Sequence, residues 1–228
     1  MIKAVSLDAA GTLFRVRGSV GAAYAGVAAR HGVRVDAAEI ERCFGAAFRR
    51  MPPLCFPGID GAELPQRERA WWKQVVTTAF AGCRFADFAA FFDDLFEHFA
   101  RPEAWELFPD VLPTLAALRA RDVRLALVSN FDGRLERLCD SLGIATDFQA
   151  IVISSRVGCA KPDPRIFMMA LERLRVPPGA ALHVGDSEVD DVEGARAAGL
   201  QAMLIRREEA DAEAAGRIRD LRELLRHV

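Results

Sequence analysis

Lysine is scarce in this sequence. Only Lys3, Lys73 and Lys161 stand among its 30 basic residues, so nearly all the positive charge comes from arginine. The basic residues do not outnumber the acidic ones, and the formal net charge is −2. Nucleic acids and anionic membrane surfaces attract proteins with a basic surplus. The sequence therefore predicts neither of these partners.

Disulfide and zinc-binding patterns are missing as well. The five cysteines are odd in number, and no two of them are spaced as C-x-x-C. This favours free thiols in a reducing cytosol over a disulfide scaffold or a zinc site. The N-terminal MIKAVSLD lacks the regions of a signal peptide, and no apolar run reaches transmembrane length. We expect a cytoplasmic protein.

The pattern of hydrophobic residues divides the chain into two kinds of region. Residues 2–8 are compact and apolar, which predicts a short buried strand before a glycine-containing turn. The next 80 residues show helical periodicity alone, whereas strand-like and helix-like segments alternate after Pro109. This alternation predicts a doubly wound α/β fold with a parallel sheet. We expect an α/β core from residues 1–14 and 105–228, and an inserted all-helical domain from residues 15–104.

The C-terminal part of this core is expected to alternate in the same way. Residues 189–199 and 216–228 carry helical patterns, and residues 201–206 lie between them as a strand. Residues 208–216 are polar and predict an exposed loop or a short surface helix.

The ends of the predicted strands hold the candidate functional residues, because ligands bind at the carboxyl ends of strands in open α/β sheets. Asp8 ends the first strand and is followed by Ala9, Ala10, Gly11 and Thr12. A carboxylate at this position could act as a nucleophile or as a metal ligand. The residues alone leave open the alternative that Asp8 caps the turn.

Two further groups follow the next strands. Ser129 and Asn130 could hold phosphate oxygens, with N-capping of the following helix as the alternative. Lys161 lies in a loop that Pro162 and Pro164 keep extended, and its ammonium could neutralise both a carboxylate and a phosphate. The alternative is a surface lysine, which the scarcity of lysine in the chain weakens.

An acidic cluster follows the strand at residues 180–186. Asp186, Asp190 and Asp191 lie in GDSEVDD, and like charges this close repel one another unless a cation is present. A small number of hard oxygen ligands suits Mg²⁺. The alternative is that Asp186 or Ser187 caps the next helix.

The four groups together resemble the motifs of the haloacid-dehalogenase-like (HAD) hydrolase superfamily, in the same order along the chain. Asp8 with Gly11-Thr12 resembles its first motif, Ser129 its second, Lys161 its third and GDSEVDD its fourth. The helical insertion resembles the cap of its subfamily I. The segments WWKQVV, VSNFD and KPDPRIF resemble the branch of the hydrolase-domain-containing protein 3.

The resemblance implies a mechanism for a small phosphorylated substrate admitted by the cap. Asp8 would attack the substrate and form an aspartyl-enzyme intermediate. Ser129, Asn130 and Lys161 would hold the phosphoryl group, and Lys161 would also steady Asp8.

The resemblance also implies a Mg²⁺ site. Its ligands would be the carboxylates of Asp8 and Asp186 and the backbone carbonyl of Ala10. Asp191 would support the metal site through contacts with the ligand residues, without being a direct ligand itself.

The sequence departs from most phosphatases of this superfamily at Ala10, where they carry a second aspartate that acts as acid and base. General acid–base help contributes about 10²–10⁴-fold to a rate. The first interpretation is a phosphatase with impaired or rerouted acid catalysis, for which Asp132 is a candidate substitute acid with helix capping as its alternative.

Three other interpretations stay open. A 2-haloacid dehalogenase needs no second aspartate, but such enzymes lack the acidic fourth motif. A phosphonatase has alanine at this position but uses a cap lysine, and Lys73 is more simply a helix-surface residue. A catalytically weak or non-catalytic protein could retain the phosphate and metal sites, although a protein that only binds would not need a nucleophile at Asp8. His183, in the strand before Asp186, is expected to be a core residue.

Overall fold

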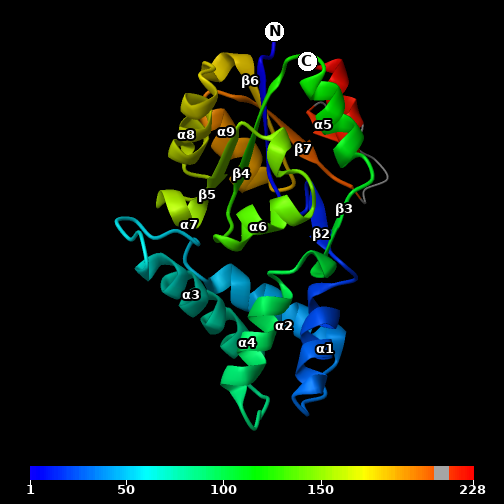
Figure 1. The fold of residues 1–228 in the computed structure, drawn as a ribbon, viewed down its shortest axis with the longest axis vertical. Coiled ribbons are helices and arrows are strands. Elements are labelled where there is room, and N and C mark those ends of the chain that lie inside the picture. Colours follow the sequence, from blue (N-terminus) through cyan, green and yellow to red (C-terminus); the bar gives the residue numbers. More distant parts are fainter. Residues whose placement is uncertain (208–215) are drawn as a thin grey trace.

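Six parallel strands form the central sheet, in the order β5-β4-β1-β6-β7-β8 (Figure 1). The computed structural model describes residues 1–207 and 216–228, so the polar segment predicted at 208–216 lies almost wholly outside the described residues. The strands are β1 Ala4–Leu7, β4 Arg124–Ser129, β5 Ala150–Ile153, β6 Ala181–Gly185, β7 Gln201–Ile205 and β8 Arg217–Ile218. The predicted doubly wound parallel α/β sheet is confirmed.

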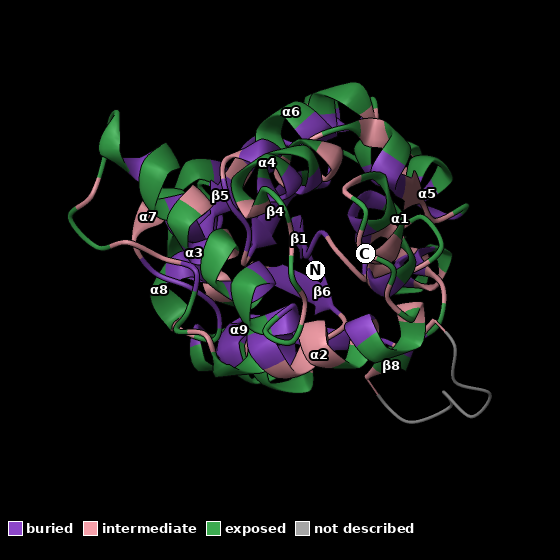
Figure 2. Cartoon of the chain, turned by 90° about the horizontal axis from the view of Figure 1, so that it is seen from below, coloured by how far each residue is buried: buried purple, intermediate pink, exposed green. Residues whose placement is uncertain are grey.

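Helices cover both faces of this sheet. Two hydrophobic clusters lie on the opposite faces, and the strands contribute alternate residues to each: Val5 and Leu7 to one, Ala126 and Val128 to the other. The first face carries α5 Val111–Arg119, α6 Arg134–Ser141 and the 3₁₀ segment η5 Leu221–Arg226, and the second carries α8 Pro164–Leu174 and α9 Gly194–Ala197. Figure 2 shows the strands as the buried centre of the molecule. The sheet is thus buried on both sides.

Four helices inserted after β2 form a cap at one end of the sheet (Figure 1). They are α1 Val20–Arg30, α2 Ala37–Arg50, α3 Glu63–Ala79 and α4 Phe88–His98. Ser19 and Asp36 cap α1 and α2, and their side chains accept hydrogen bonds from the backbone N–H groups of Ala22 and Glu39. The cap has a largely aromatic core of its own. The predicted boundaries at residues 14 and 105 stay a prediction.

A short antiparallel pair of strands, which the sequence did not predict, joins the cap to the core. Its strands, β2 Phe14–Val16 and β3 Trp105–Leu107, pair antiparallel although about 90 residues separate them. Each strand has three residues, too few to display a period of two. The remaining short elements are α7 Ser154–Val157 and the 3₁₀ turns η1 Pro102–Ala104, η2 Ala145–Asp147 and η3 Pro178–Ala180.

The helices predicted near the C-terminus are wrong in detail. The segment 216–228 begins as strand β8, because Ile218 pairs with Ile205 of β7. The 3₁₀ segment η5 follows, and Asp220 and Glu223 form a capping box at its N-terminus. The segment 189–199 is split into a π-helical turn, η4 Glu188–Glu193, and α9. Turns of this kind are rare in globular proteins and are frequently found at functional sites.

Buried polar groups join the cap to the core. Glu68 of α3 is buried, and its Oε1 accepts hydrogen bonds from the Ser155 hydroxyl (2.6 Å) and the Gly133 backbone N–H (3.0 Å). The Ser154 hydroxyl donates to the carbonyl of Leu54 (2.6 Å), in the loop between α2 and α3. These bonds hold the cap closed over the ends of the strands.

We predict that Glu68→Ala lowers the free energy of unfolding by about 1–3 kcal/mol, because the buried Ser155 hydroxyl and the half-buried Gly133 N–H lose their acceptor. Glu68→Gln keeps an acceptor oxygen and is expected to recover more than half of this loss. Urea denaturation of the three proteins measures both values. Equal losses in the two variants would contradict a hydrogen-bonding role for Glu68.

None of the helices in residues 1–207 and 216–228 is long and apolar enough to cross a membrane.

Candidate active site

The strand order brings three of the predicted site residues to one place. β1 lies between β4 and β6, with Leu7 in register with both Leu127 and Val184. The next residues of these strands therefore end side by side, and they lead to Asp8, Ser129 and Asp186. This edge of the sheet is where the topology changes direction, the usual ligand site of such folds.

Lys161 lies at the centre of this group. Its Nζ donates to Asp8 Oδ1 at 2.6 Å and to Asp191 Oδ1 at 2.5 Å. The side chains of Lys161, Asp8 and Asp191 are only 3%, 8% and 1% exposed. The surface-lysine alternative is therefore wrong, and the ammonium forms ion pairs with two buried carboxylates.

The residues that follow β4 support Asp8 and Lys161. The Ser129 hydroxyl donates to Asp8 Oδ1 at 3.2 Å. Asn130 binds the backbone of Lys161 from both ends of its amide: Nδ2 donates to the carbonyl (2.9 Å), and Oδ1 accepts from the N–H (2.8 Å). Neither residue caps α6, whose N-cap is Gly133 without a side-chain bond. In this arrangement Asn130 fixes the lysine loop.

His183 is a residue whose role the sequence analysis missed. It is buried, as expected, but its Nε2 lies 3.1 Å from Asp191 Oδ1 and its Nδ1 lies 2.8 Å from the Ser6 hydroxyl. Asp191 Oδ2 accepts a further bond from the Ser187 backbone N–H (2.9 Å). Both oxygens of Asp191 are thus occupied by protein donors. The signal in the sequence was a histidine three residues before Asp186 in a strand that ends at the site.

Burial and charge shift the pKa values of this group in different directions. Burial raises the pKa of Asp8 to about 6, against the opposing charge of Lys161 and with the help of the charges of Asp191 and Asp186. Burial likewise raises the pKa of Asp186. Burial alone would also raise the pKa of Asp191, but Lys161 and His183 hold it well below its usual range. The lysine itself stays protonated, because both carboxylates raise its pKa despite burial.

Two glycines allow the acidic side chains to fit. Gly11 has φ +88°, and a Cβ there would collide with the carboxylate of Asp186. A Cβ at Gly185 would collide with the carboxylate of Asp191. Any larger residue at either position would displace a carboxylate of the site.

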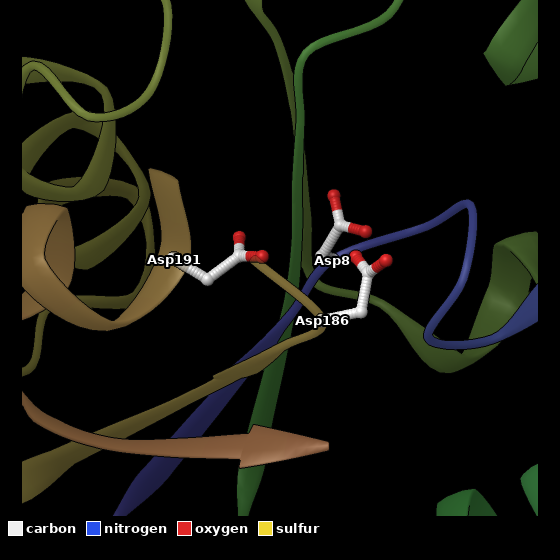
Figure 3. A group of neighbouring side chains, drawn as sticks. All are labelled: Asp8, Asp186 and Asp191. Carbon is white, nitrogen blue, oxygen red and sulfur yellow. The ribbon is translucent and has the colours of Figure 1, made fainter. Parts of the chain in front are cut away.

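Asp8, Asp186 and Asp191 form a group that could hold a metal ion (Figure 3). One carboxylate oxygen from each lies within 4.8 Å of the others. Within the described residues, neither Asp8 Oδ2 nor the Asp186 carboxylate accepts a hydrogen bond from another side chain. Hard oxygen donors of this kind, from the buried Asp8 and the half-buried Asp186, fit a divalent cation of the Mg²⁺ type. Asp191, whose oxygens are occupied, fits the supporting position better.

Asp132, the candidate substitute for the missing acid, and Lys73, the cap lysine that a phosphonatase would need, both have surroundings that do not suit these roles. Asp132 is fully buried and bound by Arg134 through Nε (2.8 Å) and Nη2 (2.7 Å). Although burial alone would raise the pKa of Asp132, the Arg134 guanidinium holds it below its usual range, so this carboxyl stays ionised. Lys73 is exposed on α3, as its helix-surface interpretation predicts. Ala10, partly buried in the turn after β1, has no acidic group to offer.

Comparison with known proteins agrees with this geometry. The family model for haloacid dehalogenase-like hydrolases matches residues 2–199. The haloacid dehalogenase-like hydrolase domain-containing protein 3 of Mus musculus is 38% identical over 207 residues, 90% of this chain and 82% of the relative. A phosphoserine phosphatase of Thermus thermophilus is 36% identical over 177 residues, 74% of this chain and 68% of the relative. The solved L-2-haloacid dehalogenase of Xanthobacter autotrophicus is similar in fold, with a TM-score of 0.74 and 21% identity over 99% of both chains.

We predict that Lys161→Met lowers the free energy of unfolding by about 3–5 kcal/mol at pH 8 in metal-free buffer, because it leaves buried carboxylates without their counter-charge. Without the ammonium, the pKa of Asp8 rises further above its ordinary value of 3.8. The folded state then binds this proton more tightly than the unfolded state, so lowering the pH from 8 to 5 restores part of the loss. Urea denaturation at both pH values measures the difference.

The exposed Lys73→Met is the matched control, with an expected change within about 0.5 kcal/mol at either pH. A loss in Lys161→Met that is the same at pH 5 and pH 8 would contradict the electrostatic account.

Proposed function

Because the chain belongs to the haloacid dehalogenase-like hydrolases, we propose that it is a Mg²⁺-dependent phosphomonoesterase that works through an aspartyl-phosphate at Asp8. The observation that carries the proposal is the arrangement around this carboxylate. Oδ1 is held by Lys161 and Ser129, while no side chain in the described residues donates a hydrogen bond to Oδ2. The Asp8 carboxylate also belongs to the acidic group with Asp186 and Asp191. One oxygen is thus fixed and the other is available. The resemblance in sequence to a phosphoserine phosphatase supports the same class of reaction.

The first chemical step is attack by a carboxylate oxygen of Asp8 on the phosphorus of a small phosphate ester. The bond from phosphorus to the leaving oxygen breaks, and its electron pair stays on that oxygen. Lys161 and the Ser129 hydroxyl lie where their positive charge and donor group stabilise the transferring phosphoryl group. In the second step water attacks the phosphorus, and the bond between phosphorus and the Asp8 oxygen breaks. The carboxylate is restored, inorganic phosphate leaves, and the proton of the water passes to the phosphate or to solvent.

The proposed cofactor site consists of Asp8, Asp186 and the backbone carbonyl of Ala10, with Asp191 in support. Bound Mg²⁺ would neutralise phosphate oxygens and bring substrate and nucleophile together. Asp191, held by Lys161, His183 and the Ser187 N–H, fixes the lysine relative to Asp8.

Ala10 favours a second candidate, a protein that binds phosphate and metal but turns over slowly or not at all. A 2-haloacid dehalogenase is less favoured, since such enzymes lack the acidic fourth motif, whereas the acidic group here could hold a metal ion.

All five cysteines are free thiols, which supports a reducing, cytoplasmic location.

We predict that the protein hydrolyses an activated aryl phosphate in the presence of Mg²⁺, and that Asp8→Asn lowers kcat by about 10³-fold or more because the nucleophile is lost. Phosphate release is the measurement. The surface variant Asp163→Asn, whose carboxylate only caps α8 and pairs with Arg165, is expected to keep wild-type activity. Hydrolysis that persists under strong chelation would refute the metal-dependent proposal.

We predict that Ala10→Asp raises kcat for alkyl phosphates by about 10²–10⁴-fold, because it restores a group that can protonate a poor leaving oxygen. Aryl phosphates should gain much less. Ala10→Asn, which has a similar size but no acid, separates the proton from the added bulk. A gain that is equal in the two variants, or equal for alkyl and aryl esters, would argue against a missing acid.

A further inference from the structure

Two consecutive arginines, Arg206 and Arg207, follow strand β7 close to the candidate active site. Strands β6 and β7 are hydrogen-bonded neighbours in the sheet, so the chain leaves β7 beside Asp186, the residue after β6. The backbone N–H of Arg206 donates to the carbonyl of Ile218 in β8 (2.8 Å). Both side chains therefore start from a fixed point at the carboxyl edge of the sheet.

Arg206 holds the loop that carries Asp186. Its Nη1 donates a hydrogen bond to the backbone carbonyl of Asp186. Because this bond is to the backbone, the carboxylate of Asp186 keeps its oxygens for the acidic group with Asp8 and Asp191 (Figure 3). Arg206 thus fixes the position of this residue without occupying its carboxylate.

Arg207 holds the turn that follows Asp8. Its Nη2 donates a hydrogen bond to the backbone carbonyl of Thr12, 195 residues away in the sequence. The guanidinium is itself fixed, because Nη1 lies 3.0 Å from both carboxylate oxygens of the buried Asp110. It also lies 3.7 Å from the centre of the Phe108 ring. The planar fork of an arginine can serve these partners at the same time, so the turn has a rigid anchor.

The two loops that the arginines hold are packed directly on each other. A Cβ at Gly11, in the turn after Asp8, would lie 2.4 Å from Oδ2 of Asp186. Ala10, whose backbone carbonyl is a proposed metal ligand, precedes this glycine. One carbonyl ligand and one carboxylate ligand of the proposed metal site therefore come from touching loops, and one arginine binds the backbone of each loop.

We propose that Arg206 and Arg207 are positioning residues for the metal site, which hold the Asp186 loop and the turn after Asp8 at the separation that a divalent cation requires. The inference rests on the proposed function and adds two residues to its cofactor site. Both act through backbone carbonyls. Removing a group that orients metal ligands typically lowers the affinity for the metal by about 10–100-fold.

The first test measures the Kd for Mn²⁺, which accepts the same oxygen ligands as Mg²⁺. The electron paramagnetic resonance signal of the free ion follows the titration. Arg206→Met and Arg207→Met are each expected to raise this Kd roughly tenfold or more. A Kd that is fitted together with the stoichiometry does not depend on the fraction of folded protein. An unchanged Kd in either variant would overturn the role of that arginine.

Arg124→Met is the matched control. Arg124 begins β4, at the end of the sheet opposite to Ser129, and its Nη1 donates to the backbone carbonyl of Leu174. This variant loses the same kind of bond far along the strand from the site, so the Kd for Mn²⁺ is expected to stay within about twofold of the wild-type value. An equal rise in Arg124→Met would mean that the fold is loosened as a whole, and would overturn the positioning role.

The conservative variant Arg206→Lys tests the hydrogen bond itself. A lysine keeps a charged donor for the one carbonyl that Arg206 binds at Asp186, so this variant is expected to recover most of the affinity for Mn²⁺. Arg207→Lys is expected to recover less, because an ammonium cannot reproduce the fork that serves Asp110 and Thr12 together. Affinity in Arg206→Lys as low as in Arg206→Met would contradict the bond to the Asp186 carbonyl as the cause.

The same titrations separate this inference from the proposed function, because they need no substrate. Weaker Mn²⁺ binding in the two methionine variants supports the positioning role even if no phosphate ester is hydrolysed. Metal-dependent hydrolysis with an unchanged Kd in both variants would overturn the positioning role and leave the proposed function standing. A wild-type protein that binds no Mn²⁺ would overturn the metal site and this inference together.

Discussion

The ion pair that Lys161 forms with Asp8 and Asp191 is the interaction on which the rest of the site depends. Three carboxylates converge within a few ångströms at the buried end of the sheet, and one ammonium offsets part of their repulsion. The surrounding groups hold this lysine in place: Asn130 grips its backbone, and His183 orients Asp191. The remaining negative charge is what makes the site suited to a divalent cation.

Much of this arrangement could be predicted from the sequence because it follows from strand order and residue chemistry. Asp8, Ser129 and Asp186 each follow an apolar strand, and a parallel sheet brings such ends to one edge. The role of Asn130 was harder to foresee, because its amide binds a backbone 31 residues away. The antiparallel pair β2–β3 and the strand at Arg217–Ile218 were not predicted, because pairing between segments that are separated in the sequence leaves no local signal.

Ala10 limits the kind of ester that suits the proposed reaction. A site without an acid at position 10 favours leaving groups that need little protonation. The cap is tied to the core through Glu68 and Ser154, so substrate entry requires these buried hydrogen bonds to open.

The proposed reaction phosphorylates Asp8. Because Ala10 cannot act as the base that would activate water in the second step, we expect the aspartyl-phosphate to accumulate during turnover of an aryl phosphate. The measurement is rapid quenching followed by borohydride reduction, which converts phosphorylated aspartate to homoserine, and mass spectrometry of the peptide that contains residue 8. Homoserine at position 8 in the Mg²⁺ reaction, and none without Mg²⁺, is the predicted result. Phosphate release with no modification of Asp8 would contradict the account.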